Sequence, residues 1–105
     1  MADYHIHVVK VGSTGEYKVR PGITVVQVGN TVEWFNDTDH AVTIVFPNGD
    51  RVFTRDPSQT INANRHSSIF TVRSGPLAGN HAYRVNLSGN KVHGEPCRSD
   101  PEIDV

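Results

Sequence analysis

The sequence has very little of the material that disulfide-stabilised, membrane-spanning or polyanion-binding proteins use. Its 105 residues include a single cysteine, Cys97, so no disulfide can form within the chain. No stretch approaches the roughly 20 apolar residues of a membrane span. The basic residues are scattered, and the formal net charge is −1. We therefore expect no nucleic-acid partner and no membrane partner.

The beginning of the chain, residues 1–5, lacks the charged and apolar regions of a secretory signal. We expect a cytoplasmic location if the sequence is complete, and a periplasmic or extracellular one if a leader has been removed. Cys97 has three open roles: a buried or idle thiol, a metal ligand, or an intermolecular bridge.

Helical signals are nearly absent, because no long window carries apolar residues at the spacing of a helix. Short β-branched runs separated by turn residues dominate instead, which predicts an all-β protein with a single domain over 1–105. We expect seven to nine strands, at 4–11, 17–19, 23–28, 31–36, 41–46, 51–53, 68–73, 82–87 and 102–105. The segments 54–64 and 88–101 are expected to be loops, the second of them long and rich in Gly, Asn and Pro.

Alternation of side chains in two of these strands separates an inner from an outer face. In 4–11, Ile6 and Val8 share one face, whereas His5 and His7 share the other. In 31–36, Trp34 is expected to fill the space between two sheets.

One stretch is more specific than composition. Residues 29–36 read Gly-Asn-Thr-Val-Glu-Trp-Phe-Asn, and His-Ala-Val follows at 40–42. This resembles the first half of cupredoxins, where Gly-Asp-Thr-Val-x-Trp-x-Asn precedes a polar loop and His-x-Val. The segment 79–85 is similar to the family's later Gly-x-Tyr-x-Tyr strand. The resemblance implies an antiparallel Greek-key β-sandwich. Asn36 can cap the loop that presents His40.

The copper ligands of that family are not all present. Type 1 copper needs a thiolate and two imidazoles, usually with a weak axial methionine. Resembling proteins place the cysteine at the end of the Gly-x-Tyr strand, and here Val85 is expected at about that position. No histidine follows Cys97, and the only methionine is Met1. The resemblance therefore implies the fold with a degenerate copper site, and not electron transfer.

A displaced metal site is the alternative. His40 stands where the family's first ligand stands, and the loop 88–101 carries His93 and Cys97. Together they would suit copper or zinc with an open position that water or Glu95 could fill, as in a metal carrier or an electron-transfer protein. In the simpler interpretation His40 is a rim residue and Cys97 an inert thiol.

The spacing of His5 and His7 can also hold a metal, although two histidines on an exposed strand face are more often without one. No nucleophile arrangement, carboxylate pair or phosphate-binding loop is visible. We therefore expect no enzyme and no cofactor. The leading hypothesis is a non-catalytic module that binds a protein or small ligand through its end loops, or that associates with itself.

Overall fold

A computed structural model describes residues 2–12, 16–47, 52–74, 79–95 and 100–105. Within these ranges the chain forms strands and no helix, which confirms the predicted all-β class. The described residues therefore include no helix that could cross a membrane. The strands are β1 (Tyr4–Val11), β2 (Glu16–Arg20), β3 (Ile23–Val25), β4 (Thr31–Asn36), β5 (Val42–Val45), β6 (Gln59–Ile61), β7 (Phe70–Thr71), β8 (Asn80–Ala82), β9 (Arg84–Leu87), β10 (Asn90–Lys91), β11 (His93–Gly94) and β12 (Glu102–Asp104).

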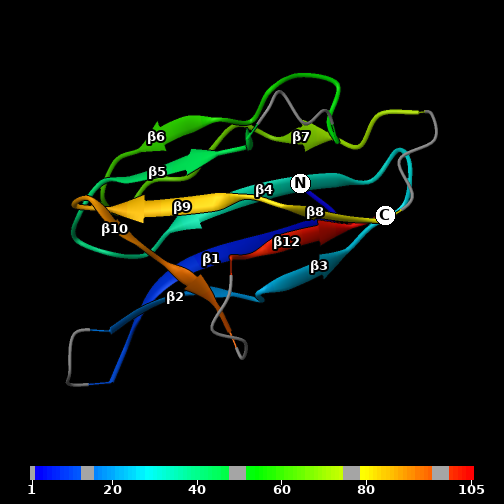
Figure 1. The fold of residues 1–105 in the computed structure, drawn as a ribbon. Helices are drawn as coiled ribbons and strands as arrows, with labels where there is room; N and C mark the ends of the chain where they lie inside the picture. Colours follow the sequence, from blue (N-terminus) through cyan, green and yellow to red (C-terminus); the bar gives the residue numbers. More distant parts are fainter. Residues whose placement is uncertain (1, 13–15, 48–51, 75–78, 96–99) are drawn as a thin grey trace.

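The strands form a sandwich of three hydrogen-bonded groups (Figure 1). The first group has the order β11-β2-β1-β4-β7, the second β10-β9-β5-β6, and the third β3-β12-β8. Pairing is mixed, since β1 runs antiparallel to β2 but parallel to β4. The predicted inner and outer faces are observed: Ile6 and Val8 are fully buried, whereas His5 is exposed and His7 half-buried.

Trp34 is the centre of the core. Its ring lies edge-on to the rings of Phe46, Phe53, Phe70 and Tyr83, with centroids 5.7 to 6.0 Å away. The indole Nε1 donates a hydrogen bond to the Tyr83 hydroxyl over 3.2 Å. Edge-to-face packing of this kind adds stability beyond the burial of the rings. The tryptophan therefore fills the space between the layers, as predicted.

The segment 88–101 differs from its prediction as an unstructured loop. Ser88 and Gly89 both have positive φ, at 51° and 82°, and they form a tight turn. The turn folds β10 back onto β9, so that Asn90 pairs with Leu87. Such two-residue hairpin turns need positive φ at both positions, which glycine supplies without strain. The loop prediction is therefore wrong over β10 and β11.

Other observed strand boundaries also differ from the predicted ones. The segment 54–64 contains β6, which pairs with β5, so it is not wholly a loop. The predicted strand 68–73 is reduced to β7, and Phe53 makes an isolated bridge to Val72. The predicted strand 82–87 divides at Tyr83, because β8 pairs with β12 whereas β9 pairs with β5.

Residues 90–94, which we call the strap, join the two larger groups of strands. β10 is the edge of one group and β11 the edge of the other, and Figure 1 shows the strap passing from β9 toward β2. Val92 lies between the two strands, is buried, and donates its backbone N–H to the Val85 carbonyl over 2.7 Å. The strap thus closes one side of the sandwich.

The strap reaches β2 only because two glycines meet there. A Cβ on Gly94 would lie 2.7 Å from the Cα of Gly22, which is backbone and cannot rotate away. We expect Gly94→Ala to lower the free energy of unfolding by about 1 to 3 kcal/mol in urea denaturation, because the strap must shift. Lys91→Ala, an exposed change in the same strap, should stay within about 0.5 kcal/mol. Equal stability of both variants would contradict this close approach.

Burial of Tyr83 gives a second prediction. Burial raises the pKa of the Tyr83 hydroxyl, whereas the hydrogen bond from Trp34 opposes the rise. The unfolded phenol ionises near pH ~10 but the folded one stays protonated, so stability should fall above that pH by about 1.4 kcal/mol per unit. Tyr83→Phe should cost about 1 to 3 kcal/mol at neutral pH, since the Trp34 N–H loses its partner, and should flatten the alkaline decline.

Urea denaturation at pH 7 to 11 measures both effects. Tyr4→Phe is the control, because Tyr4 is exposed. An alkaline decline of the same slope in Tyr83→Phe and the wild type would show that Tyr83 does not cause it.

Candidate functional site

The loop after β4 is held mainly by the buried side chain of Asn36, together with the hydroxyl of Thr38. Asn36 Nδ2 donates to the carbonyls of His40, Ile61 and Asn62 over 2.7, 3.0 and 3.2 Å. Its Oδ1 accepts hydrogen bonds from the backbone N–H and the hydroxyl of Thr38. The predicted capping role of Asn36 is therefore observed, and the backbone of His40 is fixed at this end of the sandwich.

The His40 side chain lies at the rim. It is about half exposed, at 52%, and its Nε2 is 3.5 Å from Asp39 Oδ1. Its ring meets the Tyr17 ring edge-on with centroids 6.3 Å apart. His40 is thus oriented toward β2 by an aromatic contact, with one side open to solvent.

The register of β9 shows which residue ends the strand beside this loop. Val42, two residues after His40, pairs with Leu87, whereas Val85 pairs with Ile44 deeper in the sheet. Val85 is buried in the core. Leu87 is the last residue of β9 and lies beside the loop of His40, whereas Val85 lies two residues further from that loop. The expectation that Val85 stands where cupredoxins carry their cysteine stays a prediction.

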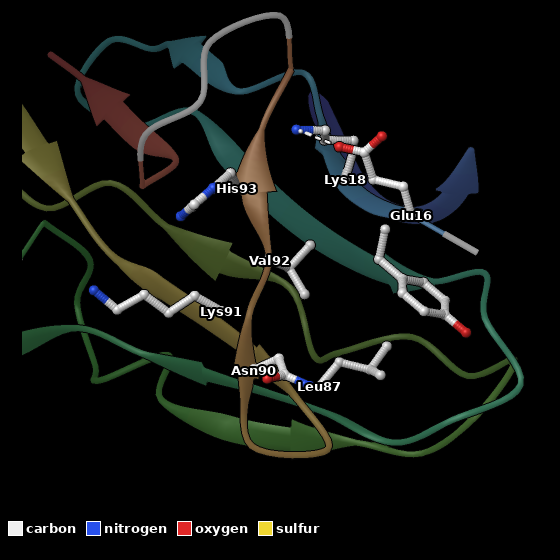
Figure 2. A pocket seen from close by; sticks show the side chains of 8 residues that line it. Glu16, Lys18, Leu87, Asn90, Lys91, Val92 and His93 are labelled. Carbon is white, nitrogen blue, oxygen red and sulfur yellow. Dashed lines mark ion pairs between the residues drawn. The ribbon is translucent and has the colours of Figure 1, made fainter. Parts of the chain in front are cut away.

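An open pocket of about 320 Å³ lies beside Leu87. Its apolar wall is made by Tyr17 of β2, Leu87 of β9 and Val92 of the strap, and Figure 2 shows Leu87 and Val92 on the same side of the strap. Polar residues complete the lining: Glu16, Lys18, Asn90, Lys91 and His93. The side chains of Lys91 and His93 extend on the side of the strap opposite Val92 (Figure 2). We call this cavity the strap pocket.

The charges around the strap pocket are partly paired. Lys18 Nζ lies 3.2 Å from Glu16 Oε1, which offsets its charge. Arg20 binds Glu95 through two hydrogen bonds of 2.9 and 3.0 Å. These bonds lower the pKa of the Glu95 carboxyl, so Glu95 is ionised and engaged. Lys91 is exposed and has no ion pair within the part of the chain that the structure describes.

The predicted metal ligands are only partly located. His93 opens β11 and pairs with Lys18 of β2, and Figure 2 shows its ring on the side of the strap opposite Val92. Cys97 lies outside the described residues. Among the described residues, no group of three or more His, Cys, Asp or Glu side chains could hold a metal ion. The set His40, His93 and Cys97 stays a prediction, and the acidic member considered with it, Glu95, binds Arg20.

Sequence reasoning missed the strap pocket. Val92 lies within the segment predicted as a loop, and Tyr17 within the predicted strand 17–19, to which no site was assigned. The Ser88-Gly89 dipeptide was the one local signal that could have indicated a hairpin and hence a strand after it.

Comparisons with known proteins place the fold. No protein-family model matches the sequence, and no curated protein matches it. Among solved structures, the chain is similar to a mutant of amicyanin with Cu(I), with a TM-score of 0.61 and 17% identity over 100% of this chain and 85% of that one. It is also similar to a purple cupredoxin from Nitrosopumilus maritimus, with a TM-score of 0.57 and 21% identity over 98% and 99%.

The chain has the cupredoxin fold. At the end of the sandwich that carries His40, β9 ends in Leu87, whose hydrocarbon side chain cannot coordinate copper, and the strap pocket opens beside it.

The Asn36 cap can be tested directly. Asn36→Asp should lower the free energy of unfolding by about 3 kcal/mol, because a carboxylate would face three carbonyl oxygens and could donate to none of them. Asn62→Asp, at an exposed position of the neighbouring loop, is the matched control and should change stability by less than about 0.5 kcal/mol. Urea denaturation at pH 7 measures both; a neutral effect of Asn36→Asp would show that the cap is dispensable.

Proposed function

We propose that the chain is a non-catalytic cupredoxin-fold module that binds a ligand at the end of the sandwich, in the strap pocket. The ligand is a small molecule, or a side chain of a protein partner, that combines an apolar body with a negative charge. The observation that carries the proposal is the pocket itself, which opens beside Leu87 at the strand end where the fold otherwise holds copper.

The size and wall of the pocket support a small apolar body. Ligand pockets of proteins usually enclose about 300 to 1,000 Å³ and are lined mainly by apolar and aromatic side chains with a few polar groups. At about 320 Å³ the strap pocket lies at the lower end of that range. Its aromatic member, Tyr17, is partly buried and packs against the core, so the wall is largely pre-formed.

The charge at the pocket favours an anion. Glu16 already pairs with Lys18, which leaves Lys91 as the pocket's unpaired cation among the described residues, with His93 nearby on the same strap. The Lys91 side chain extends on the side of the strap opposite Val92 (Figure 2), but it is long and exposed and can turn toward the pocket. There it would form a charge-assisted contact with an anionic group while the apolar body covers Leu87 and Val92. A cationic ligand would gain nothing comparable.

The proposal is tested with anilinonaphthalene sulfonate, which has an aromatic body and one sulfonate. Titration of the folded full chain, followed by ¹H–¹⁵N NMR, should shift the amides of Tyr17, Leu87 and the strap. Lys91→Glu should weaken binding about 10-fold or more, because the sulfonate would then meet a carboxylate. Arg65→Glu makes the same charge change at an exposed residue that does not line the pocket, and should bind as the wild type does.

Two results would overturn the proposal. Shifts centred on another surface would show that the strap pocket is not the binding site. Equal affinities of Lys91→Glu and Arg65→Glu would show that a charge at the pocket plays no part. Circular dichroism of each variant establishes that a loss of affinity does not come from unfolding.

A further inference from the structure

The outer face of β1 carries two imidazoles that neither the core nor the strap pocket uses. His5 and His7 are two residues apart on one strand, and they pair in register with Glu33 and Phe35 of β4. Because strand residues two apart point to the same side, both rings project from this face. Both also contact the Phe35 ring, with centroids 5.1 Å from His5 and 4.9 Å from His7.

The His7 ring is oriented by a carboxylate. Its Nδ1 lies 2.6 Å from Asp37 Oδ2. A carboxylate only accepts hydrogen bonds, so Nδ1 carries the proton and the lone pair of the neutral ring is on Nε2. Histidines that bind metals almost always donate their other ring N–H to such a partner, which fixes the tautomer and raises the basicity of the ligand nitrogen. His7 is thus prepared as an Nε2 ligand.

His5 lies close enough to complete a chelate. The centroids of the two imidazole rings are 6.5 Å apart. Two nitrogen–metal bonds of about 2.1 Å at a tetrahedral angle would place the centroids roughly 5 Å apart. His5 is exposed, and a modest rotation of its side chain closes the difference.

The surrounding charges favour a cation. Asp37 lies on one side of the pair, and Glu33 pairs in register with His5 on the other. The cation nearest in register is Arg20, opposite His7 on β2, and its guanidinium is held by both oxygens of Glu95. A divalent ion would therefore lie near two carboxylates that do not coordinate it, Asp37 beside His7 and Glu33 beside His66, and near an arginine whose charge is already offset.

We propose that His5 and His7 chelate one divalent transition-metal ion, Zn(II) or Cu(II), on the outer face of β1, with Asp37 as the positioning residue for His7. Within the described ranges no third side chain completes the set, so water fills the remaining positions. The borderline-soft ions suit imidazole, whereas Mg(II) and Ca(II) prefer oxygen ligands. This site is separate from the strap pocket and independent of the ligand proposed there.

His66 provides a matched comparison within the same face. Its Nδ1 lies 2.7 Å from Glu33 Oε2 and hydrogen-bonds the Ser67 carbonyl over 2.9 Å, so a carboxylate lies beside it as beside His7. His66 packs on the other side of Phe35, and its neighbour two residues on is Ser68 rather than a second imidazole. A single oriented histidine cannot chelate a metal ion, so replacing His66 should leave the metal affinity unchanged.

The experiment is calorimetric titration of the full chain with Zn(II) alone. One ion should bind per chain, and His5→Asn and His7→Asn should each weaken binding at least about 10-fold. Asp37→Asn should weaken it about 10- to 100-fold, and Asp37→Glu should restore part of the loss. His66→Asn should bind as the wild type does.

Electron paramagnetic resonance of the Cu(II) form separates ligands from the positioning residue. Coupling to two imidazole nitrogens in the wild type should become coupling to one in His5→Asn and in His7→Asn. The Cu(II) bound by Asp37→Asn should still couple to two imidazole nitrogens, although the affinity for the metal is lower. A general loss of structure would not give this combination.

Three outcomes would overturn the proposal: no stoichiometric Zn(II) binding to the wild type, unchanged affinity in both histidine variants, or an equal loss in His66→Asn. A metal lost instead on His40→Asn, His93→Asn or Cys97→Ser would assign it to the predicted end-loop set. Binding of anilinonaphthalene sulfonate is measured without metal, so failure of this site and failure of the strap pocket are distinguished.

Discussion

The burial of Trp34 between the layers is the interaction on which the rest of the structure depends. The indole belongs to β4 of the five-stranded group, yet its N–H bonds the hydroxyl of Tyr83, which separates β8 from β9 in the other two groups. Its backbone is fixed as well, because the Trp34 N–H donates to Ser67 Oγ and the Trp34 carbonyl accepts from the Ser67 N–H. One residue therefore sets the spacing and the register that carry Asn36, His40 and Leu87 to the same end.

That end of the sandwich combines a firmly held loop with an open pocket. The loop of His40 is still held by a buried amide, but the strand opposite ends in Leu87, and the strap covers the space with Val92. A hydrocarbon side chain at this strand end suits an apolar group rather than a soft metal ion. The imidazoles of His5 and His7 lie elsewhere, on the outer face of β1.

Much of the fold was readable from the sequence because its longer strands alternate clearly. The alternation in 4–11 separated buried Ile6 and Val8 from His5 and His7 correctly, and the residue types at Trp34 and Asn36 predicted their roles. The strap was not predictable in this way, since strands of two residues have no period to detect. The division of the predicted strand 82–87 at Tyr83 was not predictable either, because its two halves pair with different strands. The carboxylates beside His7 and His66 come from other strands and loops, so no local sequence pattern predicts these contacts.

The strap affects how readily the molecule can associate with other chains. Unpaired strand edges are templates on which other chains can add strands and aggregate. The two larger groups end in β10 and β11, which are short strands of the same strap. That side of the molecule therefore offers other chains no long, flat strand edge. β3 is different, because it ends its own group and exposes Ile23 and Val25. A strand from another chain could thus add at the edge of β3, beside exposed apolar side chains, but not along the strap.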